Sequence, residues 1–292
     1  MRLVHLAIAA LLLANASPAP QAQPAKPPAP APQNYLGFDA NDYPGDDLLP
    51  ALRKQFAFTG YWLNNPPGAD HNPWVGKRDI LLRNGFGFLV VANGRLDKEI
   101  LRSQKSGKPP AALAREDAAA AVAAAQRDGF PPHTILFLDQ EDGGRMLPEQ
   151  AAYLLAWTEA VAQSAYLPGV YASGEPAPDG KGPDGKPVTI TTIQDIRQQV
   201  AAQHLHDIAF WVYDDACPPA PGCVVQPSQV RAPDLSGTLH SSAWQYAQSP
   251  QRKNLTRSCT ATYRDGNCYA PGVPQFPLDL SVSSSPDPSH GR

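Results

Sequence analysis

Four acidic side chains lie at the ends of apolar runs that are typical of buried strands: Asp39, Asp139, Glu141 and Asp279. Side chains two residues apart on a strand point the same way and are about 6.6 Å apart, so Asp139 and Glu141 are expected to face one cavity. Two carboxylates in one cavity disfavour each other's ionised form, which leaves a proton donor beside an ionised partner. Hydrolysis of a glycosidic bond requires that division of roles.

Glu141 is the predicted proton donor because its side chain is longer than that of Asp139 and reaches farther above the strand end. Asp139, Asp39 and Asp279 are predicted to orient a substrate and to stabilise developing positive charge. Taken alone, an Asp at a strand end more often caps a helix or a turn. The catalytic prediction therefore depends on the four carboxylates meeting at one place.

A second set of residues near the same strand ends suits sugar binding, because aromatic rings stack on sugar faces and polar groups bond to hydroxyls. The predicted substrate-binding residues are Tyr61, Tyr171, Trp211, Asp214, Trp244, Gln245 and Tyr246. Trp62, near the same rim, could also stack on a sugar face; for Trp62 and Trp211 the alternative is packing beneath loops. Trp157 lies on an apolar helical stripe and is predicted to belong to the core.

The elements that must position these residues alternate between strand and helix. Apolar, β-branched or aromatic runs predict strands at residues 35–39, 58–63, 86–92, 134–139, 169–172, 208–213, 242–246 and 276–282. Helical patterns follow the first five strands, at residues 47–56, 77–83, 115–128, 148–165 and 193–206. Such alternation favours a closed parallel barrel with its active site at the carboxyl ends of the strands. The predicted fold class is α/β, a divergent TIM barrel of five βα units followed by three strands with long loops.

Four cysteines lie in the Pro- and Gly-rich loops of the last third of the chain. Their order suggests two local disulfides, Cys217 with Cys223 and Cys259 with Cys268, among three possible pairings. Neither spacing matches a zinc site, and the seven histidines show no ligand-like pair. We expect no metal ion and no organic cofactor.

The N-terminus has the layout of a secretory signal peptide, with Met1, Arg2 and an apolar run over residues 6–14 followed by small residues. The expected organisation is a signal peptide at 1–22, a Pro/Ala-rich linker at 23–34, the barrel domain at 35–284 and a disordered tail at 285–292. A secreted or periplasmic location follows from this layout.

Charge and hydropathy exclude two classes of partner. Lys and Arg number 24 against 27 Asp and Glu, for a net charge of −3, and no basic stripe is present, so nucleic acid is not an expected partner. No later segment reaches the roughly 20 apolar residues of a membrane-spanning helix. We expect a monomer that binds a cell-wall glycan or another carbohydrate.

Motifs along the chain also carry a family resemblance; in order they are GFDAND, TILFLDQEDG, LPGVYAS, FWVYDD, WQYAQ and PLDLSV. They resemble family 25 glycoside hydrolases, the muramidase-type lysozymes. The stretches WVGKRDILLRNGFGFLVV and AREDAAAAVAAAQRDGF resemble the glycoside-hydrolase-like domain of unknown function found in secreted bacterial proteins. The family 25 resemblance implies cleavage of the muramic acid to glucosamine linkage of peptidoglycan, with site residues at Asp39, Asp139, Glu141 and Asp279.

The function predicted from the sequence is that of an exported glycoside hydrolase acting on a cell-envelope glycan, with peptidoglycan as the expected substrate. The alternative is a non-catalytic glycan-binding module on the same barrel, since one fold hosts many functions. A third reading is a purely structural exported domain, whose barrel mouth would be filled by side chains or by the loop over residues 216–240.

Overall fold

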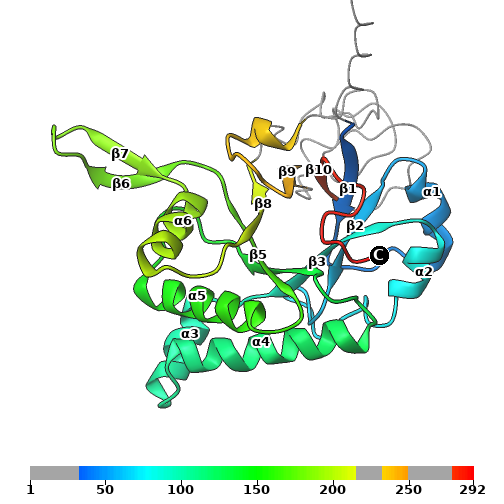
Figure 1. The fold of residues 1–292 in the computed structure, drawn as a ribbon, viewed down its shortest axis with the longest axis horizontal. Coiled ribbons are helices and arrows are strands. Elements are labelled where there is room, and N and C mark those ends of the chain that lie inside the picture. The colour runs from blue at the N-terminus through cyan, green and yellow to red at the C-terminus, as the bar shows by residue number, and fades with distance from the viewer. Residues whose placement is uncertain (1–32, 215–231, 249–277) are drawn as a thin grey trace, which may run out of the picture. The chain divides into compact units, whose positions relative to one another are not determined.

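The computed structural model describes residues 33–214, 232–248 and 278–292. Its strands close into a barrel in the order β1-β10-β9-β8-β5-β4-β3-β2 (Figure 1). The barrel strands are β1 (Tyr35–Asp39), β2 (Phe58–Trp62), β3 (Gly87–Asn93), β4 (Ile135–Gln140), β5 (Leu167–Ser173), β8 (Ala209–Tyr213), β9 (Ala243–Ala247) and β10 (Asp279–Ser283). A separate hairpin is formed by β6 (Ala177–Lys181) and β7 (Pro187–Ile190).

The helices lie between the first strands, as predicted. They are α1 (Leu49–Arg53), α2 (Arg78–Arg83), α3 (Asp97–Lys105), α4 (Pro110–Arg127), α5 (Pro148–Ala162) and α6 (Thr192–Gln203), with short 3-10 helices at Asp46–Leu48 and Pro233–Ser236. The strands close into a barrel and a helix follows each of β1, β2, β3, β4 and β5, so the prediction of a divergent TIM barrel is confirmed. Two elements were not predicted: helix α3 and the β6–β7 hairpin, which projects away from the barrel beside α6 (Figure 1).

The expectation of parallel pairing throughout the barrel is wrong for its last strand, which runs against its neighbours. β10 pairs in antiparallel fashion with both β1 and β9, whereas β1 to β9 pair in parallel around the rest of the barrel. Antiparallel neighbours can be joined at one end of a sheet without a crossover helix. As a result the first residue of β10, Asp279, lies opposite Asp39, the last residue of β1.

Helices α4 and α5 lie side by side against one flank of the barrel (Figure 1). The inner side of α4 is built almost entirely of alanine: Ala114, Ala118, Ala121 and Ala125 are buried at helical spacing. Such small side chains allow close approach of α5, whose Trp157 is buried in the core as predicted.

The C-terminal segment packs against the barrel, and the expectation of a disordered tail at residues 285–292 is wrong. Ser289 is fully buried. Its N–H donates to Phe88 O at 2.9 Å, its carbonyl accepts from Ile135 N at 2.8 Å, and its Oγ accepts from Val90 N at 2.8 Å. The segment thus bridges the first residues of β3 and β4. Two of these bonds join backbone groups and the third is accepted by the serine hydroxyl, so a segment rich in Pro and Ser can be ordered without a large apolar side chain.

Three of the sequence expectations lie outside the described residues: the signal peptide, most of the linker and all four cysteines. Within the part of the chain that the structure describes, no helix is long and apolar enough to cross a membrane.

Candidate active site

The carboxyl ends of the parallel strands bring the four predicted carboxylates to one cavity of about 240 Å³. Asp39 ends β1, Asp139 lies in β4, and Glu141 directly follows β4. Asp279 reaches the same place from the opposite direction, because it begins the antiparallel strand β10. The convergence on which the catalytic prediction depends is present.

A hydrogen-bond chain across the barrel fixes Asp39. The Tyr171 hydroxyl donates to Gln245 Oε1 at 2.7 Å, and Gln245 Nε2 donates to Asp39 Oδ1 and Oδ2 at 3.1 and 3.2 Å. Because the amide oxygen is taken by the tyrosine, the amide nitrogen must face Asp39, where it favours the ionised carboxylate. Gly60 leaves room for the Asp39 side chain, since a Cβ on residue 60 would lie 2.6 Å from the Cβ of Asp39.

Burial and mutual repulsion raise the pKa values of three carboxyl groups in the cavity. The pKa of Asp39 is raised well above its ordinary value, first by burial and then by Asp279. The pKa of Asp139 is raised by burial and by Glu141, and that of Glu141 by burial and by Asp142. Each of these groups therefore keeps its proton to a higher pH than a free Asp or Glu. The surroundings of the cavity thus favour the neutral, protonated form of all three carboxyl groups.

Asp139 carries a buried oxygen with no protein partner. The residue is 7% exposed, and its Oδ1 has no hydrogen bond within the described residues. An unsatisfied buried polar atom costs about 1–3 kcal/mol, so such atoms are rare outside sites where they have a use. Asp139 lines the cavity, but its Oδ1 is itself buried, so the missing partner adds to the cost of ionising this carboxyl group.

The backbone that carries Glu141 is anchored from three sides. The Tyr213 hydroxyl donates to the Glu141 carbonyl at 2.6 Å, and Thr192 Oγ1 donates to the Asp142 carbonyl at 3.1 Å. Gln150 Nε2 also donates to Asp142 Oδ2. The loop after β4 is thereby held while the Glu141 side chain stays exposed at the mouth of the barrel.

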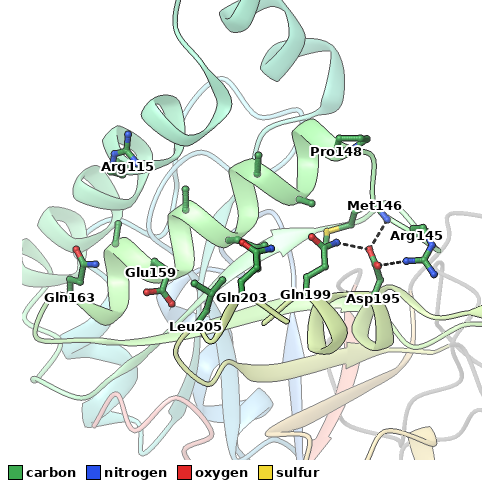
Figure 2. A pocket seen from close by; sticks show the side chains of 15 residues that line it. Arg115, Arg145, Met146, Pro148, Glu159, Gln163, Asp195, Gln199, Gln203 and Leu205 are labelled. Atoms are coloured by element: carbon green, nitrogen blue, oxygen red, sulfur yellow. Dashed lines mark hydrogen bonds and ion pairs between the residues drawn. The ribbon is translucent and has the colours of Figure 1, made fainter. Parts of the chain in front are cut away.

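A larger hollow of about 710 Å³ lies between α5 and α6, away from the four carboxylates (Figure 2). Its most buried charge is Asp195, which accepts bonds from Arg145 Nη1 at 2.8 Å, Met146 N at 3.0 Å and Gln199 Nε2 at 3.1 Å. Arg145 also forms a two-bond ion pair with Asp179 of the hairpin. These bonds tie the loop after β4 to α6 and to the hairpin, which is a structural role.

Three of the residues predicted to bind substrate line the carboxylate cavity: Tyr171, Trp211 and Gln245. Tyr61 does not, and its predicted sugar contact is wrong for this cavity. Its ring is fully buried against Phe130, with the ring centroids 5.0 Å apart, and its hydroxyl donates to Asp128 Oδ2 at 2.9 Å. Tyr61 therefore faces the outer layer of the barrel.

Asp214, Trp244 and Tyr246 also do not line the carboxylate cavity. Trp244 and Tyr246 flank Gln245 on β9, so they point to the opposite side of the strand from it. Trp244 is buried there, donates from Nε1 to the Asp214 carbonyl at 2.9 Å and packs edge-on against Tyr246.

The prediction omitted five residues that line the cavity: Asn41, Trp62, Pro67, Val91 and Gln248. Of these, Trp62 was considered from the sequence as an aromatic residue near the rim, and it faces the opposite side of β2 from Tyr61. Its Nε1 donates to the Ala40 carbonyl at 3.1 Å, which holds the ring beside Asp39.

Cys217, Cys223, Cys259 and Cys268 lie outside the described residues, so the two disulfides stay predictions. Among the residues that the structure does describe, no group of three or more His, Cys, Asp or Glu side chains is arranged to hold a metal ion.

A family profile described as "Rv2525c-like, glycoside hydrolase-like domain" matches residues 69–257. A comparison with curated proteins gives no match.

Solved structures resemble this chain at low sequence identity. An uncharacterized B. stearothermophilus protein is 19% identical with a TM-score of 0.50, over 85% of this chain and 95% of that one. The Mycobacterium tuberculosis Tat-secreted protein Rv2525c, in complex with L-tartrate, is 12% identical with a TM-score of 0.47, over 86% and 95% of the two chains. The Clostridium perfringens spore cortex lytic enzyme SleM is 13% identical with a TM-score of 0.48, over 88% and 69%.

Proposed function

Since the chain belongs to the Rv2525c-like, glycoside hydrolase-like family, we propose that it hydrolyses peptidoglycan by muramidase-type cleavage at the carboxylate cluster. One observation carries the proposal. Four acidic side chains line a single cavity together with the rings of Tyr171 and Trp211, at the end of the barrel where such folds hold their active sites. Acidic groups with aromatic walls are the chemistry that glycoside hydrolysis uses.

Glu141 acts as the proton donor. It stands exposed at the mouth, and its raised pKa keeps the carboxyl protonated at pH values where a free Glu is ionised. The proton passes to the oxygen that links the two sugars while the C1–O bond breaks, and the leaving sugar departs as an alcohol. Positive charge then develops on C1 and the ring oxygen of the other sugar.

Acidic groups deeper in the cavity stabilise that positive charge, because a positive charge developing beside them favours their ionised forms. Gln245 donates to both oxygens of Asp39 and so favours the ionised form against the effects of burial and Asp279, and Asp139 lines the same cavity. Asp279 adds a further acidic group beside Asp39. Water then bonds to C1 and gives a proton to the Glu141 carboxylate, which restores the acid for the next cycle.

Export is part of the same proposal, because peptidoglycan lies outside the cytoplasmic membrane. The support is the signal-like pattern of residues 1–22, in which Met1 and Arg2 precede the apolar run at 6–14. Expression of the full chain with N-terminal sequencing of the exported product tests it. Recovery of uncleaved protein in the cytoplasm alone would contradict it.

Hydrolysis is tested by release of reducing sugar from purified peptidoglycan by the wild-type protein and by the variants Glu141→Gln and Asp139→Asn. The matched control is Glu116→Gln, an exposed Glu on α4 that pairs with Lys108. Circular dichroism establishes that each variant is folded. Loss of the proton donor is expected to slow release by about 10²–10⁴-fold, whereas the control should retain full activity.

A wild-type protein that binds peptidoglycan but releases nothing would contradict hydrolysis and support the glycan-binding alternative. A protein that neither binds nor releases it would contradict both functions and support a structural domain. Equal activity of wild type and Glu141→Gln would remove Glu141 from its role as proton donor.

A further inference from the structure

A second cavity of about 220 Å³ adjoins the first along Asp139 and Glu141. Both residues, together with Pro67, line both cavities. The remaining lining comes from the loop after β2, the end of β3 with the turn into α3, and the end of β4 with the loop after it. The volume is several times the roughly 30 Å³ that one water molecule occupies in the liquid, so it has room for an amino group and the carbon that carries it.

The segments that form this cavity are bonded to one another. Asn93 N donates to Asn64 Oδ1 at 2.7 Å, and Asn64 Nδ2 donates to the Asn93 carbonyl at 3.0 Å. Gly94 allows the backbone after β3 to approach β4 closely, since a Cβ on residue 94 would lie 2.4 Å from the Asp139 carbonyl oxygen. The wall of the cavity is therefore set by bonds and packing between the ends of neighbouring strands.

Acidic groups dominate the lining of the second cavity. Four of its residues carry a carboxyl group: Glu99, Asp139, Glu141 and Asp142. Among the described residues that line it, Arg95 is the single cation. The Arg95 guanidinium is already engaged, because its Nε and Nη2 donate to the two oxygens of Asp117 at 2.8 and 2.7 Å. A cavity lined mostly by acids attracts a cationic group and repels an anionic one.

The acids of the outer wall are held in place and keep acceptor oxygens for a ligand. Glu99 Oε2 accepts from Leu96 N at 2.9 Å, and Asp142 Oδ2 accepts from Gln150 Nε2. No described residue bonds to the other oxygen of either side chain. An ammonium group carries three N–H donors and no acceptor, so it matches such a lining.

Asp139 gives an independent indication that the ligand is a donor. The residue is 7% exposed, and no described residue donates a hydrogen bond to its carboxyl group. Its Oδ1 is buried, so Oδ2 is the oxygen that opens toward the cavities. A buried carboxyl group without a partner is costly, and a cationic donor in the second cavity supplies a partner for Oδ2.

We propose that the second cavity binds a primary ammonium group carried by the glycan, with Glu99, Asp139 and Asp142 as its acceptors. The identity of the glycan rests on the proposed function. In peptidoglycan such a group has two sources, a glucosamine that lacks its acetyl group and the free amine of a diamino acid in the stem peptide. A metal ion fits less well, because no three acidic side chains of the described residues are arranged to hold one. The site therefore favours glycans with free amines over fully acetylated ones.

Calorimetric binding to the full chain carrying Glu141→Gln tests the proposal without turnover, because Gln resembles the neutral acid in shape. The first pair of probes is a tetrasaccharide of alternating glucosamine and N-acetylmuramic acid, with the glucosamine amines either free or acetylated. The second pair is the fully acetylated tetrasaccharide with a stem peptide whose diamino-acid amine is free or acetylated. In at least one pair, at neutral pH and low salt, the free amine is expected to bind about three- to tenfold more tightly.

Variants of the cavity wall test which groups recognise the amine. Glu99→Gln removes one charge from the second cavity and keeps an oxygen that can cap α3. It should weaken binding of the free-amine probe by about two- to fivefold, and Asp142→Asn should do the same. Arg95→Gln removes the cation and should tighten binding of that probe, whereas a site for an anion would lose affinity.

The matched control is Glu116→Gln on α4, which lies outside both cavities and should bind as the parent does. Circular dichroism establishes that each variant is folded. Preference for the free amine in the first pair of probes alone assigns the ammonium group to the sugar. Preference in the second pair alone assigns it to the stem peptide.

Equal binding of the free and acetylated probes in both pairs would overturn the ammonium site, as would tighter binding of the free amine that neither Glu99→Gln nor Asp142→Asn reduces. Release of sugar by the wild type in that case would leave the proposed hydrolysis standing. Binding that depends on the amine and on Glu99, in a wild type without turnover, would contradict hydrolysis and keep the ammonium site. Failure to bind any probe would overturn both proposals.

Discussion

Replacing Asp139 by Asn is expected to stabilise the fold and to abolish hydrolysis, with a gain in stability that grows with pH. Asp139 is 7% exposed, its Oδ1 lacks a partner among the described residues, and burial and Glu141 raise its pKa. Asn has nearly the same shape as the protonated acid but does not ionise. The substitution therefore removes the cost of a buried charge and keeps the packing.

The sign and size follow from proton linkage. An unfolded Asp loses its proton near pH 4, whereas the folded Asp139 keeps it to a higher pH, so the native state binds the extra proton between those two values. In that range the free energy of unfolding of the wild type falls by about 1.4 kcal/mol per pH unit for this group. The Asp139→Asn variant does not lose this stability, because its amide does not ionise. One pH unit above 4, its melting temperature should exceed that of the wild type by about 3–6 °C.

Urea unfolding of both proteins at a series of pH values from 4 upward measures the difference. Asp207→Asn, at an exposed Asp outside the cavity, is the matched control and should show no such trend. A difference between Asp139→Asn and wild type that is constant with pH, or that shrinks as pH rises, would refute the reasoning.

Three further results are expected. Asp142→Asn removes a charge that raises the pKa of Glu141, so the alkaline limb of the pH–rate profile should move to lower pH; an unmoved limb would contradict the role of Glu141 as acid. Tyr213→Phe deletes the bond to the Glu141 carbonyl and should lower kcat by about three- to tenfold, as steady-state kinetics will show, whereas an unchanged kcat would mean that this anchor is dispensable. Ser289→Ala leaves the Val90 N–H unpaired and should cost about 1–3 kcal/mol in urea unfolding with activity retained; unchanged stability would count against an ordered tail.

The sequence predicts that Asp139 and Glu141 face the same cavity because side chains on a strand alternate between its two sides. The same rule places Gln245 on the opposite side of β9 from its neighbours Trp244 and Tyr246. With Gln245 in the cavity, both aromatic residues must face outward, as they do.

Which side of β2 faces the barrel interior could not be predicted in this way. All five of its residues, Phe58–Trp62, are buried. A strand covered on both sides gives no polar face from which to read its orientation. Whether Tyr61 or Trp62 enters the barrel is decided by pairing with β1 and β3, which a helix and loops separate from β2 along the chain.

Local patterns also missed elements that depend on distant contacts. Helix α3 (Asp97–Lys105) buries only Ile100, so its sequence carries no continuous apolar stripe. The C-terminal segment is rich in Ser and Pro, yet its backbone bonds to β3 and β4 give it a fixed place. The position of Asp279 beside Asp39 likewise required the antiparallel direction of β10.

The central claim is that the carboxylate cluster cleaves peptidoglycan at muramic acid. Its most direct test is to digest purified peptidoglycan with the protein, reduce the new chain ends with borohydride and identify the reduced sugar. The account predicts reduced muramic acid from the wild type and no new reduced end from Glu141→Gln. Reduced glucosamine as the product, or no new end from the wild type, would contradict it.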